Sequence, residues 1–533
     1  MMEPYDYTWM FGVTMVFAFM DAYGIGANDV ANSFATSVAS GSLSLAQACF
    51  VAIFTEFLGA LLLGAHTADT IKGGILSVRR FADVPEVLML CMTCAIIGSS
   101  TWVLFATKNG WPVSTTHSIV GAVLGVGIAA FGGGSINWGW SGVGQIICSW
   151  FLSPIFAGIV SAIIYSITKY GILRQRDSIK WALRIIPAYF FFTTAIEAFY
   201  LIYKGAPGTQ ASKMNVGEII GIAFGIGAFF ALFAILFFCP WLKRRVVGRE
   251  ELRWYHIFVI PFLGPRPVVE RLPQSKEVVP EETIESSGSS ANEETKYVKT
   301  EEQGPQPAQD EQSPAPVSKL QYAKEKFLSI VLHGIRKDVR NLENNHVKSV
   351  HDAAEVYDSD VEYMFSFLQV ITACMASFAH GSNDVSNAVG PLSAVYDIWQ
   401  TAEVDVTGKV AVPLWILAYG GVAIDLGLAT YGYNIMRSLG NNIILFTPTR
   451  GFSAELGAAL TVLTCSKLGL PVSTTHCITG ATAAVGLCNG KIGAVNWKML
   501  TWCFFSWILT LPAAGLVAGL LFAFCAYGPT IYQ

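Results

Sequence analysis

Charged residues are scarce in this sequence. Only 14% of its 533 residues are Asp, Glu, Lys or Arg, whereas a soluble domain carries roughly 25%. Hydrophobic residues make up 53% of the chain, and apolar runs of about 20 residues recur along most of its length, as in membrane-spanning helices. We therefore predict an all-α polytopic membrane protein that contacts the lipid bilayer and has no nucleic-acid partner.

The motifs of several other protein classes are also missing. The chain has no Gly-x4-Gly-Lys-Ser/Thr loop of an ATP-driven pump, and no His-Glu-x-x-His motif or dense carboxylate–histidine cluster of a metalloenzyme. Most of its eleven cysteines lie in apolar runs, and Cys91 and Cys94 have no second pair with which to form a zinc site. There is no Asn-x-Ser/Thr sequon, and the acidic start lacks the basic region of a signal peptide. An enzyme, a primary pump and a bound cofactor are therefore not expected.

Two short boxes each occur twice, in the same order. Pro-Val-Ser-Thr-Thr-His stands at 112–117 and again at 471–476. Gly-x-Asn-Asp-Val-x-Asn stands at 26–32 and again at 381–387. The second copies follow the first by 359 and 355 residues, which indicates a duplicated unit.

The duplication divides the chain into four segments. They are a membrane unit at 1–170, two linking transmembrane helices at 181–240, a polar loop at 241–363 and a second membrane unit at 364–533, with about 12 transmembrane helices in total. The loop is rich in Glu, Ser, Pro, Gln and Asn from Glu281 to Ser318, a composition that cannot bury a core. We expect it to be largely disordered, with one amphipathic helix at about Leu320–Val339.

The basic residues predict which side of the membrane each segment faces. The strongest clusters lie at 169–176 and 243–245, and the positive-inside rule places both in the cytoplasm. Seven crossings before the loop, with the run from Pro112 counted as a full crossing, put both termini outside. The two units are then inverted relative to each other, while Arg79 and Arg80 lie outside, against the rule. Inverted repeats whose helices break at matching polar boxes, around a central site, are typical of secondary transporters.

The hydroxyl boxes predict an anion site. Proline suits the first position of a helix, and the residues after it offer free backbone N–H groups at the positive end of the helix dipole. One copy alone would be better explained as a helix cap. Two copies in inverted units favour an oxyanion held between two helix starts, with hydroxyl groups from Ser114, Thr115, Thr116, Ser473, Thr474 and Thr475.

The Asn-Asp boxes predict a cation site beside it. A charged Asp at the bilayer centre costs about 2.5–3.5 kcal/mol, so Asp29 and Asp384 are functional candidates. With the amide oxygens of Asn28, Asn32, Asn383 and Asn387 they could hold Na⁺, which would neutralise the carboxylates before the anion binds. The carboxylates could also accept from a protonated oxyanion, and an asparagine such as Asn383 could donate to its oxygen atoms. The alternative is that these residues end helices or join them by hydrogen bonds.

Other polar residues lie within apolar runs. Glu56 is several residues inside its run and is a functional candidate, whereas Glu455 starts a late run, where an interfacial charge would explain it. Asp425 is a third candidate. His117 and His476 could sense protons, although hydrogen bonding at a helix start is the more ordinary interpretation.

Together these boxes resemble those of the inorganic phosphate transporter (PiT) family, and the resemblance covers both membrane units. The Pro-Val-Ser-Thr-Thr-His form and the stretch His351–Glu355 look most similar to the fungal sodium–phosphate symporters of the plasma membrane. The resemblance implies sodium-coupled uptake of inorganic phosphate, about twelve spans and outward-facing termini. It also implies that Asp29, Asp384, their neighbouring asparagines and the two Ser-Thr-Thr runs bind the ions, and that Glu56 and Glu455 match the family's membrane glutamates. Some members of the family are proton-coupled.

The main hypothesis is therefore a symporter that imports inorganic phosphate with sodium by alternating access. The alternatives are a proton-coupled permease for phosphate or a similar oxyanion such as sulfate, and a membrane phosphate sensor. A homodimer and regulators that bind the cytoplasmic loop are further partners that the sequence leaves open.

Overall fold

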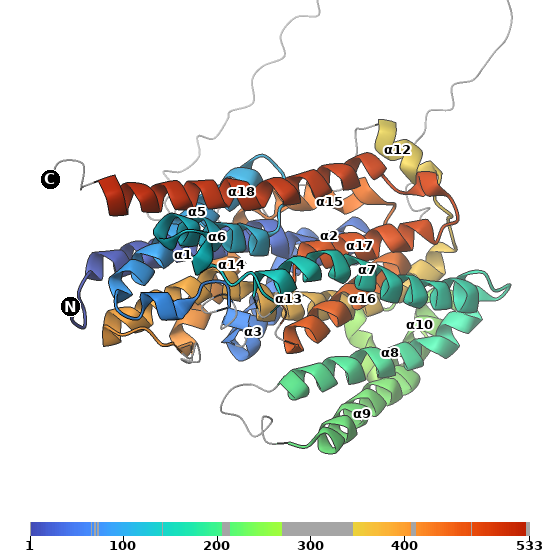
Figure 1. The fold of residues 1–533 in the computed structure, drawn as a ribbon. Coiled ribbons are helices and arrows are strands. Elements are labelled where there is room, and N and C mark those ends of the chain that lie inside the picture. The colour runs from blue at the N-terminus through green and yellow to red at the C-terminus, as the bar shows by residue number, and fades with distance from the viewer. Residues whose placement is uncertain are drawn as a thin grey trace, which may run out of the picture.

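The computed structural model describes residues 2–65, 67–68, 71, 74–140, 142–204, 214–268, 345–406, 412–468, 470 and 472–528. Within these ranges the chain folds into helices and has only two isolated β-bridges (Figure 1). Nine of the described helices are long and apolar enough to span a membrane. The prediction of an all-α polytopic protein is confirmed, and the total of about twelve spans stays a prediction. The predicted helix at Leu320–Val339 and the residue Pro471 lie outside the described residues.

The first membrane unit begins with one long, nearly continuous helix. Two of its later helices start at side-chain caps, the Ser44–Gln47 capping box before α3 and Ser114 before α6. The elements are α1 (Thr8–Ile25), the π-helix η1 (Gly26–Val30), α2 (Ala31–Ala39), α3 (Leu45–Leu63), α5 (Pro85–Lys108), α6 (Thr115–Phe131), α7 (Val143–Thr168) and the π-helix η4 (Lys169–Leu173).

The second unit has a matching series of helices, and a helical pair lies between the units. The second unit contains α13 (Ser359–Thr401), α14 (Leu414–Tyr431), α15 (Tyr433–Ile443), α16 (Pro448–Lys467), α17 (Thr474–Leu487) and α18 (Trp497–Tyr527). The connecting elements are α8 (Ser178–Lys204), α9 (Val216–Phe233), η6 (Ala234–Phe238), α10 (Cys239–Leu242), η7 (Lys243–Val247), η8 (Trp254–Phe262) and α12 (Asn345–Asp352). The pair α8–α9 packs at one edge of the bundle (Figure 1).

The Asn-Asp boxes remain helical, contrary to the expectation that they interrupt their spans. The first box widens into the π-turn η1 between α1 and α2, and the second lies inside the unbroken 43-residue helix α13. A π-turn shifts the helical register locally, so the first box differs from the second in register although both stay within buried helices. The breaks at the site lie instead in the turns before α6 and α17.

Equivalent close contacts join the two units. A Cβ atom added at Gly26 would lie 1.8 Å from the carbonyl oxygen of Ile424, and one at Gly381 would lie 2.2 Å from that of Glu56. Only glycine lets two helix backbones approach so closely. A second such pair of contacts joins Gly427 to Tyr23 and Gly59 to Phe378. The duplicated sequences therefore pack against each other through duplicated contacts.

The hydroxyl boxes lie at the turns of two hairpins, α5–α6 and α16–α17. Helix α18, about 46 Å long, begins beside the base of α16–α17, where the Asn496 N–H donates to the Ile443 carbonyl (2.9 Å). It ends beside the base of α5–α6, where the Tyr527 hydroxyl donates to the Ala129 carbonyl (3.0 Å). The two bases thus lie at opposite ends of α18, while the starts of α6 and α17 meet between them.

The run from Pro112 is shorter than the full crossing expected of it. Helix α6 has 17 residues, or about 25 Å, against a hydrocarbon core of about 30 Å. It is short because it begins at a buried cap, Ser114, rather than at the surface. Since α5 and α6 together return to the end from which α5 starts, the expected sidedness of the other segments does not change.

The start of α1 and the end of α18 lie at one end of the bundle, and α12 lies at the other (Figure 1). At the first end, the Tyr5 N–H donates to the carbonyl of Trp399, near the end of α13 (2.7 Å). At the other end, Glu355 pairs with Lys169 (2.9 Å) and Arg174 (2.7 Å) after α7. The segment that leads from the long loop into α13 is thereby fastened to the first unit.

Candidate functional site

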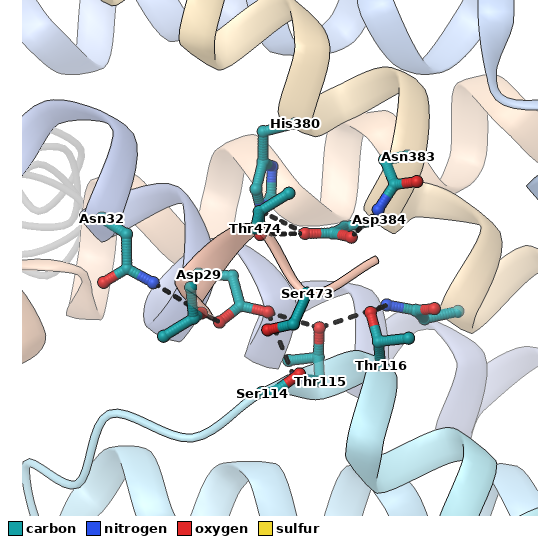
Figure 2. Close-up of polar contacts among 12 residues, drawn as sticks. Asp29, Asn32, Ser114, Thr115, Thr116, His380, Asn383, Asp384, Ser473 and Thr474 are labelled. Atoms are coloured by element: carbon teal, nitrogen blue, oxygen red, sulfur yellow. Dashed lines mark hydrogen bonds and ion pairs between the residues drawn. The ribbon is translucent and has the colours of Figure 1, made fainter. Parts of the chain in front are cut away.

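Four elements bring the two pairs of boxes together in the centre of the bundle. They are η1, α13 and the first turns of α6 and α17 (Figure 2). Asp29, Asp384, Ser114 and Ser473 are each only 1% exposed. The structure therefore joins residues that are more than 350 positions apart into one buried polar site.

Asp29 connects the starts of both short helices. Its Oδ2 atom accepts from the hydroxyl (2.5 Å) and the backbone N–H (3.2 Å) of Thr115 on α6. Its Oδ1 atom accepts from the hydroxyl of Thr475 on α17 (2.8 Å). One carboxylate of the first unit therefore holds hydroxyl groups from both units.

Asp384 holds the start of α17 from the other side. Its Oδ2 atom accepts from the Thr474 hydroxyl (2.6 Å), and its Oδ1 atom accepts from the Asn383 amide (2.7 Å). The Nε2 atom of His380, one turn earlier on α13, lies 2.9 Å from Oδ2. Oxygen or nitrogen atoms of Asp29, Asp384 and His380 all lie within 4.8 Å of one another.

The last asparagine of each box binds the hairpin of the opposite unit. The Asn32 amide donates to the Thr475 hydroxyl (2.8 Å). The Asn387 amide donates to the hydroxyls of Thr115 and Thr116 (both 3.2 Å). This crossed arrangement ties each unit to the other at the site.

The first asparagine of each box instead holds the turn of a hairpin. The Asn28 amide donates to the Trp111 carbonyl (3.1 Å) and its Oδ1 atom accepts from the Val113 N–H (3.2 Å). The Asn383 amide donates to the Val472 carbonyl (2.9 Å). The Asn28 oxygen is thus already bonded. Among the described residues, the Oδ1 atoms of Asn32 and Asn383 have no hydrogen-bond partner and remain open to a cation.

Ser114 and Ser473 are helix caps in the structure. Each Oγ atom accepts from the backbone N–H three residues later, at His117 and His476 (3.3 Å each). A capping oxygen keeps its own proton, so each hydroxyl can still donate to an anion. The ring Nδ1 atoms of the two histidines lie against the carbonyls of Trp507 and Trp150, which agrees with the ordinary interpretation of a histidine hydrogen-bonded at a helix start.

His380 is a site residue that the motifs did not reveal. Its Nδ1 atom pairs with Glu56 of α3 and its Nε2 atom with Asp384, so it bridges two acids. Ser377 also donates to Glu56 (2.7 Å). The position 355 residues earlier is Ile25, so the duplication gave no sign of it. The one available signal was a histidine directly before the second box.

Glu455 belongs to a separate polar cluster and is not an interfacial charge. It is 0% exposed, so that interpretation is wrong. Its carboxylate accepts from Ser37 (2.5 Å) and Thr372 (2.6 Å), and further donors are the side chains of Thr36 and Gln369. The cluster lies between α2, α13 and α16, and it concentrates oxygen atoms around one buried acid.

The central site is closed in this conformation. Two cavities that border it, both lined in part by Asn32, have volumes of about 20 Å³ each. A water molecule needs about 10–15 Å³ on this measure, so each cavity admits no more than a water or a bare ion. An oxyanion requires the starts of α6 and α17 to separate.

Comparisons with known proteins agree with this geometry. The profile described as "Phosphate transporter family" matches residues 25–518. The chain is 37% identical to the phosphate-repressible phosphate permease pho-4 of Neurospora crassa, over 99% of each chain. It is 30% identical to sodium-dependent phosphate transporter 1 of Homo sapiens, over 98% of this chain and 96% of that protein. A solved structure described as "The sodium-dependent phosphate transporter" is 27% identical and matches with a TM-score of 0.67, covering 98% of this chain and 100% of the other.

Proposed function

Because the chain belongs to the phosphate transporter family, we propose that it is a symporter that imports inorganic phosphate together with sodium by alternating access. The single observation that carries this proposal is the buried pair Asp29 and Asp384, each bonded to the start of a short helix from a hydroxyl box. The relatives are named as transporters and a permease, in agreement with the prediction that the chain is not an enzyme.

The two carboxylates are suited to bind the sodium ion. Two acids whose atoms lie within 4.8 Å of each other in a buried site repel strongly when both are charged. A monovalent cation between them removes this repulsion, and Na⁺ prefers oxygen ligands. Besides the two acids, the free Oδ1 atoms of Asn32 and Asn383 supply such ligands. Glu56 and Glu455 would serve further cations from their own clusters.

Phosphate suits the starts of α6 and α17. Both helices offer unpaired backbone N–H groups at the positive ends of their dipoles. The hydroxyl protons of Ser114, Thr116 and Ser473 are not used to bond a carboxylate, whereas those of Thr115, Thr474 and Thr475 are. We assign direct phosphate donation to the first three.

The two ions then bind in an obligatory order. Before sodium arrives, the carboxylates repel an anion and hold the threonine hydroxyls. Sodium neutralises the carboxylates, and only then does phosphate gain from the helix dipoles. Coupling follows because phosphate binds only to the site that already holds sodium.

Alternating access follows from the arrangement of the two hairpins. Each has its base at an opposite end of α18, and both contribute to one closed site. Opening one hairpin exposes the site to one side and opening the other exposes it to the second, as in transporters built from inverted repeats. With the positive-inside rule, the end that carries α12 faces the cytoplasm and the protein lies in the plasma membrane.

A proton-coupled permease for phosphate or a similar oxyanion is the second candidate. His380 favours it, because a titratable base stands between Glu56 and Asp384 at the site. In that mechanism a proton on the histidine would replace one sodium ion.

Uptake of radiolabelled phosphate into proteoliposomes distinguishes the candidates. The purified full-length protein should accumulate phosphate when a sodium gradient is imposed at equal pH. Accumulation that follows only a pH gradient would assign the function to the second candidate. A protein that binds phosphate but accumulates none under any gradient would be a sensor.

A further inference from the structure

Asp21 is a buried acid that the proposed transport reaction does not use. It lies on α1 five residues before the start of η1, and its side chain is 0% exposed. Neither of its carboxylate oxygens has a hydrogen-bond partner among the described residues. By contrast, the carboxylates of Asp29, Asp384 and Glu455 all accept from hydroxyl groups. A buried carboxylate without donors is unfavourable, so Asp21 requires a positive partner of its own.

Two serines form a polar path beside this acid. The Ser99 hydroxyl of α5 lies beside Asp21. It donates to the Ser118 hydroxyl of α6 (3.1 Å), and both serines are fully buried. Ser118 stands three residues after Thr115, which bonds to Asp29. The acid is thus connected to the helix that forms half of the central site.

The equivalent place in the second unit has no polar group of this kind. With the offsets of the two boxes, the residues that correspond to Asp21, Ser99 and Ser118 are Ala376, Ala458 and Cys477. The structure supports these offsets, because Gly98 and Gly457 make equivalent contacts with α18 and α7. The same packing is therefore achieved without an acid, and the fold does not explain why Asp21 is there.

We propose that Asp21 is a proton-binding site of the transporter, neutral in this closed conformation and charged when the site opens to water. A proton satisfies a carboxylate that has one hydroxyl beside it, whereas Na⁺ requires several oxygen ligands in a shell. The inference rests on the proposed transport function for its role in the cycle. The charges of Asp21 and Asp29 repel each other, so a proton on the first and a sodium ion on the second relieve the same repulsion and are coupled.

Among the charged groups around Asp21, the carboxyl group of Asp29 is the one that interacts with it electrostatically. No hydrogen bond joins the two acids. The elements packed against α1 are η1, α5, α13 and α14. Their other titratable side chains are Glu86, Cys91, Cys94 and Lys108 on α5, Asp360, Glu362, Tyr363, Cys374, His380, Asp384, Tyr396 and Asp397 on α13, and Tyr419, Asp425 and Tyr431 on α14.

The pH dependence of transport by Asp21→Asn tests the proposal. Asparagine has the shape of the neutral acid and cannot ionise. Sodium-driven phosphate uptake should be measured in proteoliposomes between about pH 6 and about pH 9, and expressed as the ratio of mutant to wild type, because the ratio cancels the titration of phosphate itself. We expect the ratio to rise with pH, approaching tenfold for each pH unit above the point where Asp21 titrates. Asp83→Asn, at an exposed acid before α5, should give a constant ratio.

A constant ratio for Asp21→Asn would overturn the proposal. A lower steepness of sodium activation with a constant pH ratio would instead assign the acid to sodium. Infrared spectra give a readout that needs no transport: the carbonyl band of a protonated carboxylic acid should be present in wild type and weaker in Asp21→Asn. If the mutant does not fold, Ser99→Ala with Ser118→Ala, which keeps the acid, should change the frequency of that band. If the wild-type protein transports no phosphate but shows the carbonyl band of a protonated acid that weakens in Asp21→Asn, the proposed function would be refuted while the proton site at Asp21 would stand.

Discussion

At the scale of single residues, the hydroxyl groups of the site divide by what their protons do. Thr115, Thr474 and Thr475 donate to the two aspartates. Ser114 and Ser473 accept from backbone N–H groups and keep their protons. A serine that only caps a helix and a serine that also binds phosphate look alike in the closed conformation, so substitutions must separate the two roles.

Replacing both serines by glycine separates them. Glycine at a helix cap costs only a few tenths of a kcal/mol relative to serine, so Ser114→Gly with Ser473→Gly should leave the melting temperature almost unchanged. A hydrogen bond to a charged group contributes about 1.5–3 kcal/mol, so the phosphate KM should rise by about tenfold or more for each lost hydroxyl. Phosphate uptake kinetics at saturating sodium measure this. An unchanged KM would leave the serines as caps alone.

The two aspartates should be equally necessary for coupling. Asp29→Asn and Asp384→Asn each remove one of the two charges to which we assign sodium, so we expect sodium-driven phosphate accumulation to be lost in each. The measurement is uptake against sodium concentration in proteoliposomes. Wild-type sodium dependence in both mutants would refute the two-carboxylate mechanism. Glu403→Asn, at an exposed acid beyond α13, should keep wild-type coupling.

Repetition explains which site residues could be predicted. Asp29 and Thr115 stand in boxes that occur twice, and a repeated polar box in apolar sequence has few structural explanations. His380 and Gln369 have no such repetition, and their partners Glu56 and Glu455 lie 324 and 86 residues away. A contact across that distance is fixed by helix packing, which a single sequence does not show.

At the scale of the elements, the crossing of α1 and α14 depends on a missing side chain. Gly26→Ala would place a Cβ atom 1.8 Å from the Ile424 carbonyl oxygen. The backbone cannot move aside as a side chain can. The loss of folding free energy should therefore reach or exceed the roughly 1–3 kcal/mol that an overpacked core costs. We expect a melting temperature several degrees lower, or loss of monodisperse protein in detergent.

Gly12→Ala is the matched control for that substitution. It lies on the same helix, and nothing lies within 4 Å of a Cβ atom added there. Alanine is the better helix former by roughly 0.5–1 kcal/mol, so the melting temperature should stay the same or rise. Equal destabilisation by both substitutions would show that the close crossing is not the cause.

The segment between α12 and α13 should be held by a pH-dependent contact. Partial burial alone would raise the pKa of Glu355, but hydrogen bonds from Tyr357, Lys169 and Arg174 outweigh it and bring the pKa to about 2, from the ordinary glutamate value of 4.5. A carboxyl group whose pKa is lowered by folding stabilises the protein above the unfolded pKa, and this stabilisation is lost as the pH falls toward the folded pKa. The contact should therefore be complete near neutral pH and weaken below about pH 4.5.

Glu355→Gln tests this contact. Glutamine keeps the size of the side chain and removes its charge, so the mutant should melt at a lower temperature at about pH 7, by on the order of 1–3 kcal/mol in stability. The difference from wild type should shrink as the pH falls below about 4.5. Thermal melting in detergent at several pH values measures it, and Glu403→Gln should show no difference at any of them. A difference that does not depend on pH would refute the assignment to charge.

The helices that carry the Asn-Asp boxes show where the sequence pattern failed to predict the course of a helix. Glycine and asparagine in sequence favour a break, and this was predicted for both boxes. In the fold the glycines serve close helix crossings, and the asparagines bond to the hairpin turns. Tertiary contacts thus satisfy groups that would end an isolated helix.

For the whole molecule, hydropathy and the duplication were enough to predict a helical membrane protein with one site between two related units. They were not enough to show that α6 and α17 begin inside the bundle, because α6 is apolar like the helices around it. The length of a run predicts whether it can cross a membrane, but only its cap shows where it starts. The predicted sidedness does not depend on this difference, because each hairpin returns to the end where it began.

That sidedness can be tested with two cysteine substitutions. Glu403 and Lys348 are both exposed and lie at opposite ends of the bundle, beyond the end of α13 and on α12. If the basic clusters face the cytoplasm, Glu403→Cys should react with a membrane-impermeant maleimide in intact cells, above the labelling of the wild-type cysteines. Lys348→Cys should react only after the cells are permeabilised. The reverse pattern would invert the whole molecule, and labelling of both in intact cells would mean that the two ends are not on opposite sides, contrary to an α18 of about 46 Å that joins them.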